Sequence, residues 1–120
     1  VPQGIPGLDT ALGLSRMMGK KPLYIAMLRR YLSGQQDVAA DIRRAIENGD
    51  RALAERLAHT TKAVSGNVGA TVVQDRAALV ETALRERADA QALQPLVEGL
   101  DEALSPLLAR LSSHFALPGA

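Results

Sequence analysis

The tripeptide Asn48-Gly49-Asp50 combines a signal for the end of one helix with a signal for the beginning of the next. Glycine is favoured in the left-handed conformation just after a helix, and aspartate is favoured as the cap of a helix N-terminus. A connection this short brings its two flanking helices side by side and antiparallel. Residues 48–50 are therefore interpreted as the first corner of a helical bundle.

On the N-terminal side of this corner, apolar residues recur at helical spacing. They predict one long helix over residues 21–48, with Pro22 in its first turn and a kink at Ser33-Gly34. Its apolar stripe consists of Leu23, Met27, Tyr31, Val38, Ile42 and Ile46. A short helix capped by Asp9 and ending near Gly19 is predicted to precede it.

On the C-terminal side of the corner, three more helices are predicted. The first covers residues 51–68 and ends at Gly69, the second is capped by Thr71, and the third is capped by Asp89 and kinked at Pro106. No alternating pattern typical of strands is found. The sequence thus predicts an all-α fold, an antiparallel four-helix bundle with a short extra N-terminal helix.

The composition fits one domain and argues against several classes of function. The 120 residues are interpreted as a linker at 1–6, the bundle at 7–117 and a tail at 118–120. With 14 basic against 13 acidic residues and 2% aromatics, the chain offers no patch for nucleic acid or a membrane surface. It has no cysteine for a thiolate metal site and no apolar stretch long enough to span a bilayer. We expect a cytoplasmic, monomeric domain that belongs to a longer protein.

The helix that follows the corner carries an unusual outer face. With Leu57 at the centre of the buried side, His59 lies about 160° away and Lys62 about 140° away. These two residues have the i, i+3 spacing at which helix side chains meet. Ala63 and Gly66 share the face, although glycine inside a helix costs about 1 kcal/mol relative to alanine. Close approach of a partner surface would compensate for that cost.

A histidine with these neighbours suits a phosphoryl acceptor. Imidazole ionises near pH 6.5, so a neutral nucleophilic nitrogen is available at neutral pH. In-line attack requires an exposed ring, and a nearby cation such as Lys62 offsets the charge of the transferred group. Spacing alone leaves open a merely solvated histidine and a helix-packing role for the small residues. His114 has no lysine three residues on and is interpreted as a helix-end side chain.

The run Ala58-His59-Thr60-Thr61-Lys62-Ala63-Val64-Ser65-Gly66-Asn67-Val68-Gly69-Ala70 resembles the motif of histidine-containing phosphotransfer (HPt) domains of bacterial phosphorelays. The similarity extends to Ile5-Pro6-Gly7-Leu8-Asp9, to Leu23-Tyr24 and to Asn48-Gly49-Asp50. It implies that His59 is phosphorylated, that Lys62 is the phosphate-side cation and that Gly66 lets a partner approach. Ala63 stands where the family most often has glycine.

The resemblance also implies the partners. Aspartates of response-regulator receiver domains would donate and accept the phosphoryl group, with Mg²⁺ in the receiver and no cofactor in this chain. The chain would have no kinase activity of its own and would belong to a hybrid sensor histidine kinase. The docking surface is expected to comprise Ala52, Glu55, Arg56, Ala63 and Gly66 around His59.

Two alternatives to phosphotransfer are a receiver-docking module that no longer carries phosphate and a purely structural helical bundle. A phosphorylation assay and a measurement of size in solution would separate them. Charged residues outside the motif are interpreted as solvated helix faces with possible i, i+4 pairs and without chemistry. They include Asp37, Asp41, Glu47 and the run Arg85-Glu86-Arg87.

Overall fold

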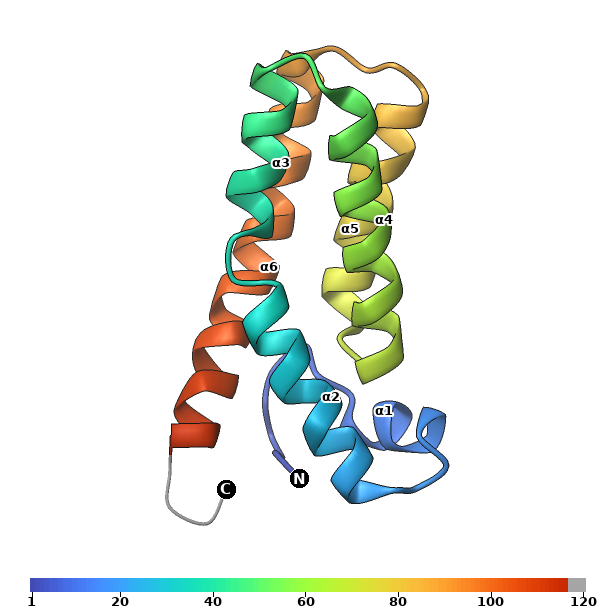
Figure 1. Cartoon of the computed structure of the whole chain (residues 1–120), viewed down its shortest axis with the longest axis vertical. Coiled ribbons are helices and arrows are strands. Elements are labelled where there is room, and N and C mark those ends of the chain that lie inside the picture. Colours follow the sequence, from blue (N-terminus) through green and yellow to red (C-terminus); the bar gives the residue numbers. More distant parts are fainter. Residues whose placement is uncertain (117–120) are drawn as a thin grey trace.

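The computed structural model describes residues 1–116, which form six α-helices and no strand. The helices are α1 (Thr10–Arg16), α2 (Lys21–Gly34), α3 (Val38–Glu47), α4 (Arg51–Val68), α5 (Thr71–Arg85) and α6 (Ala90–Ala116). In Figure 1, α3, α4, α5 and the first half of α6 run alongside one another, α2 prolongs α3, and α1 lies beyond the end of α4. The predicted four-helix bundle with an extra N-terminal helix is confirmed. The predicted domain end at 117 and the tail at 118–120 lie outside the described residues.

The corner at residues 48–50 has the predicted construction. Gly49 has a φ of +75°, and the Asp50 side chain accepts a hydrogen bond from the Leu53 N–H at 3.1 Å. Asp9 and Asp89 cap α1 and α6 in the same way. The predicted cap at Thr71 is wrong, because Ala70 occupies the N-cap of α5 and makes no side-chain cap bond.

The single helix predicted over residues 21–48 is wrong, because the chain forms α2 and α3 with a break at residues 35–37. The break turns Gln35 inward, where its Oε1 accepts a hydrogen bond from the buried Thr61 hydroxyl at 2.7 Å. The apolar register also differs from the prediction. Leu23 is exposed, whereas Tyr24 is buried and donates from its hydroxyl to the Val68 carbonyl at 2.8 Å.

The core is aliphatic, and much of it comes from α6. The buried side chains of this helix are Leu93, Val97, Leu100, Leu104, Leu107, Leu108 and Leu111. As expected, α6 does not end at Pro106, and it also continues through Pro95. The segment predicted as a linker lies against the bundle, with Pro2 buried and Ile5 packed on the core. No helix within residues 1–116 has the length and apolar character needed to cross a membrane.

The buried side of α4 consists mainly of small residues together with Val68, and Leu57 is not at its centre as predicted. Ala54, Ala58, Thr61 and Ser65 are buried, whereas Leu57 is only half-buried. On a helical wheel this rotates the buried side by about 60° from Leu57. Small side chains let neighbouring helices approach closely, and the Ser65 hydroxyl is satisfied by the Tyr31 hydroxyl at 2.8 Å. The rotation turns Lys62 and Gly66 towards α5 and leaves the His59 side chain exposed on the surface of the bundle.

Candidate functional site

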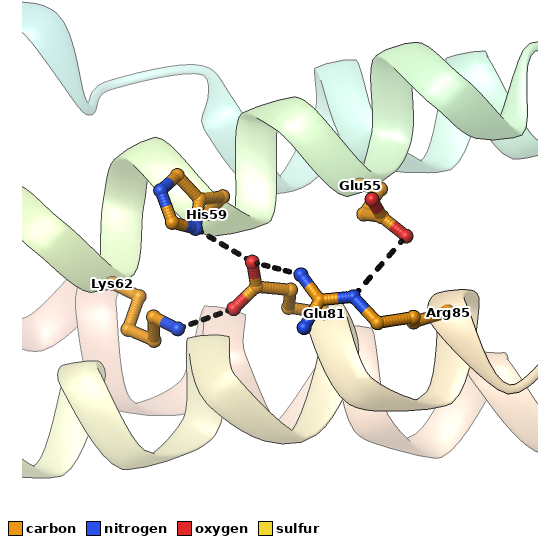
Figure 2. A network of polar contacts seen from close by, with 5 residues as sticks. All are labelled: Glu55, His59, Lys62, Glu81 and Arg85. Atoms are coloured by element: carbon orange, nitrogen blue, oxygen red, sulfur yellow. Dashed lines mark hydrogen bonds and ion pairs between the residues drawn. The ribbon is translucent and has the colours of Figure 1, made fainter.

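His59 lies in the middle of α4 with its side chain 59% exposed. Two full turns of helix precede it, and Asp50 caps their N-terminus, so its backbone is held on both sides. Figure 2 shows the ring beside charged side chains of α4 and α5, namely Glu55, Lys62, Glu81 and Arg85. The structure therefore presents an accessible imidazole on a rigid element.

Glu81 of α5 is the centre of this group of charges. Its carboxylate is only 2% exposed, and it contacts three cationic or polar partners. The partners are His59 Nδ1 at 2.6 Å from Oε2, Lys62 Nζ at 2.5 Å from Oε1 and Arg85 Nη2 at 2.9 Å from Oε2. Figure 2 shows Lys62 and His59 reaching across from α4 while Arg85 follows Glu81 on α5. Both oxygens of the carboxylate thus have partners.

The Glu81 carboxyl group is held in its ionised form. Burial raises its pKa, but the hydrogen bonds from Lys62 and His59 and their charges outweigh burial and bring the pKa below its ordinary value. An ionised carboxylate can only accept hydrogen bonds. His59 therefore donates its Nδ1–H to Glu81.

This contact determines which nitrogen of the imidazole is left without a protein partner in the network. A neutral histidine that carries its proton on Nδ1 has a free lone pair on Nε2. Figure 2 shows the second ring nitrogen on the side of the ring away from Glu81. The arrangement is that of an oriented nucleophile, with Glu81 positioned to stabilise positive charge on the ring as Nε2 forms a bond.

Arg85 extends the network towards the N-terminal end of α4. Its Nε lies 3.9 Å from Glu55 Oε1, while its Nη2 binds Glu81. The Arg85 side chain is 62% exposed and forms an i, i+4 pair with Glu81, as interpreted from the sequence, but this pair also joins it to the charges around His59. Glu81 was missed altogether, although it stands at helical spacing from Ala77 and Leu84 in the apolar stripe of α5. A carboxylate within an apolar stripe is a signal for a buried charge with partners.

The expected docking residues do not share one environment. Ala52, Arg56 and Ala63 are exposed and Glu55 is half-buried. Gly66 is buried, and a Cβ added there would lie 2.7 Å from the side-chain nitrogen Nε2 of Gln74. The carbonyl of Gly66 also accepts a hydrogen bond from Arg16. The expectation of Gly66 on an open face is wrong, because this glycine makes room for a side chain of α5.

His114 lies in the last turn of α6 and takes no part in the network. Its ring meets that of Phe115 edge-on, with 5.2 Å between the centroids. Within residues 1–116, no three histidine, cysteine or acidic side chains gather where they could hold a metal ion.

Comparison with known proteins gives a family and a fold. The model of the Hpt domain family matches residues 26–113. A solved structure of the HPT domain from a sensor hybrid histidine kinase of Shewanella superposes with a TM-score of 0.84. The alignment covers 98% of this chain and 100% of that chain at 20% identity, so the likeness is one of fold. No curated protein matches the chain.

Proposed function

The chain belongs to the Hpt domain family and has a phosphotransfer role, and from that premise we propose that it carries the phosphoryl group on His59. The donor is an aspartyl phosphate on one receiver domain, and the acceptor is an aspartate on another. Mg²⁺ is supplied by the receiver, and the chain acts as a carrier without kinase activity of its own.

The observation that carries the proposal is the 2.6 Å contact between His59 Nδ1 and the buried Glu81 carboxylate. It leaves Nε2 as the free nitrogen of a ring that is 59% exposed. An exposed Nε2 in the middle of an ordered helix suits in-line approach of a phosphorus atom carried by a partner. Phosphoryl transfer depends on such positioning and on electrostatics more than on covalent catalysis by the protein.

In the proposed step, the Nε2 lone pair attacks the phosphorus of the aspartyl phosphate. An N–P bond forms while the P–O bond to the donor aspartate breaks, and its electron pair returns to the donor carboxylate. The ring gains positive charge that is shared with Nδ1–H, and Glu81 stabilises it by accepting the hydrogen bond. In the onward step a second aspartate attacks the phosphorus, and Nε2 leaves with the electron pair of the N–P bond.

Lys62 is proposed as the cation that faces the phosphoryl group. Its ammonium binds Glu81 at 2.5 Å, and its side chain remains 33% exposed. A phosphoryl group on Nε2 adds negative charge close to this ammonium, which has three donors and can bind two anions at once. Lys62 would then bridge the Glu81 carboxylate and the phosphoryl oxygens.

The experiment is phosphotransfer from a phosphorylated receiver domain with Mg²⁺ to the wild type and to His59→Gln and His114→Gln variants. Acid-labile, base-stable label is expected on the wild type and on His114→Gln, and none on His59→Gln. A folded wild type that takes no label from several receivers, but still binds them, would replace the proposal with the docking-only module. Label that persists on His59→Gln would move the acceptor to another residue.

A further inference from the structure

An open groove of about 570 Å³ lies where the N-terminal end of α4 meets the C-terminal end of α5. Its charged lining consists of three arginines, Arg51, Arg85 and Arg87, and one carboxylate, Glu55. We call this the arginine groove. Because arginines outnumber carboxylates in it, the groove presents net positive charge to solvent.

The arginine groove adjoins the phosphorylation site. Glu55 precedes His59 by four residues on α4, the spacing at which side chains lie on the same helix face. Arg85 contacts Glu55 at 3.9 Å and Glu81 at 2.9 Å, and Glu81 binds His59. Figure 2 shows this sequence of contacts running from His59 to Glu55. A partner seated over His59 would therefore cover the groove or its edge.

Two of the three arginines are placed against local stability. Arg51 is the first residue of α4, where the positive end of the helix dipole disfavours a cation. Arg87 has a φ of +62°, in a region that favours glycine. Residues that break local rules in this way are concentrated at functional sites. The placement of these cations is thus better explained by a binding role than by a contribution to folding.

The opposite flank of α4 has a different charge. A second groove there, between α4 and the break that joins α2 to α3, is lined by Asp37, Asp41 and Arg56. The helix that bears His59 therefore separates a basic groove from one with two carboxylates. A docking partner with an acidic side would be oriented by this difference.

We propose that the arginine groove docks a carboxylate-bearing segment of the receiver domain that exchanges phosphate with His59, an inference that rests on the proposed function. The guanidinium group matches a carboxylate in planar, bidentate geometry, which suits recognition of aspartate and glutamate. Charges at the rim of an interface act mainly on the association rate and on orientation. The groove thus speeds encounter and turns the partner's aspartate towards Nε2.

The test is a variant that removes the charge without weakening the fold. Arg51→Glu places a favourable charge at the start of α4, and Arg87→Gly suits the positive φ, so the double variant is expected to be at least as stable as the wild type. Lys21→Glu with Arg110→Gln changes the net charge equally and leaves the groove intact. Arg85 is kept in both proteins because it binds Glu81.

The measurement is kcat/KM for transfer from a phosphorylated receiver at several salt concentrations. The groove variant is expected to lose about tenfold at low salt through KM and to depend less on salt, whereas the control retains the wild-type rate. A groove variant with wild-type rate and salt dependence, or an equal loss of rate in the control, would overturn the docking role of the arginine groove and leave the proposed function of His59 intact. A wild type that takes no label would overturn the proposed function and this inference together.

Discussion

Replacing Glu81 by glutamine tests the role of the buried carboxylate. Glutamine has nearly the same shape, and its oxygen can still accept the His59 Nδ1–H. The charge is lost, however, and the amide can instead donate to an unprotonated Nδ1. That second arrangement places the proton on Nε2 and blocks the nucleophile. The substitution therefore weakens both the stabilisation of positive charge and the choice of tautomer.

The size of the effect follows from the 2.6 Å contact between Nδ1 and Oε2. A hydrogen bond to a charged group contributes about 1.5–3 kcal/mol, against about 0.5–1.5 kcal/mol for a neutral one. The two ranges differ by about 1–1.5 kcal/mol. Because the His59 ring is 59% exposed, solvent screens part of this difference, and about 1 kcal/mol remains. This corresponds to a rate of phosphoryl transfer about fivefold below that of the wild type.

The assay is single-turnover transfer from a phosphorylated receiver, with Glu86→Gln, an exposed residue at the C-cap of α5, as the control. Nitrogen-15 NMR of His59 reports the tautomer, which a purely structural effect on the bundle would leave unchanged. The expected result is slower transfer with a loss of the Nδ1–H form in Glu81→Gln only. A folded Glu81→Gln protein with the wild-type rate and the wild-type tautomer would refute the positioning role.

Three further predictions concern the same region and its packing. Lys62→Ala should slow phosphoryl transfer about tenfold, because the cation beside the phosphoryl group is lost. Lys62→Arg restores a cation and should recover part of the rate, which single-turnover kinetics measure. Gly13→Ala should lower the free energy of unfolding by about 2 kcal/mol, because its Cβ would collide with a backbone carbonyl of α4. Gly66→Ala should lower it by less, because the Gln74 side chain can move. Urea denaturation measures both losses, and equal losses would contradict this difference in packing. The pKa of Glu81 is lowered on folding, so its contribution to stability is present above its ordinary value of 4.5 and is lost as the pH falls through the folded pKa. Urea midpoints should therefore drop more steeply in acid for the wild type than for Glu81→Gln.

Local features of the chain were predictable from sequence. The corner at residues 48–50 depends on a glycine that takes a positive φ and an aspartate that caps the next turn, both of which act within a few residues. His59 and Lys62 were found together for the same reason, since helical spacing alone places them on neighbouring turns. Periodicity and capping were enough to predict the bundle.

Features that depend on contacts between helices were not predictable in this way. Glu81 is 22 residues from His59, and their contact depends on the rotation of α4 against α5. That rotation is set by small buried residues of α4, which carry a weaker apolar signal than Leu57. The break between α2 and α3 likewise depends on a contact between Gln35 and Thr61, 26 residues apart.

The atom that bears the phosphoryl group is the most direct test of the proposed transfer through Nε2 of His59. Phosphorus–nitrogen couplings in nitrogen-15-labelled, phosphorylated protein identify the atom that bears the phosphoryl group. We predict phosphorus on Nε2 of His59, with Nδ1 still protonated and hydrogen-bonded to Glu81. Phosphorus on Nδ1 of His59 would contradict the assigned tautomer, and phosphorus on His114 would contradict the assignment of the site.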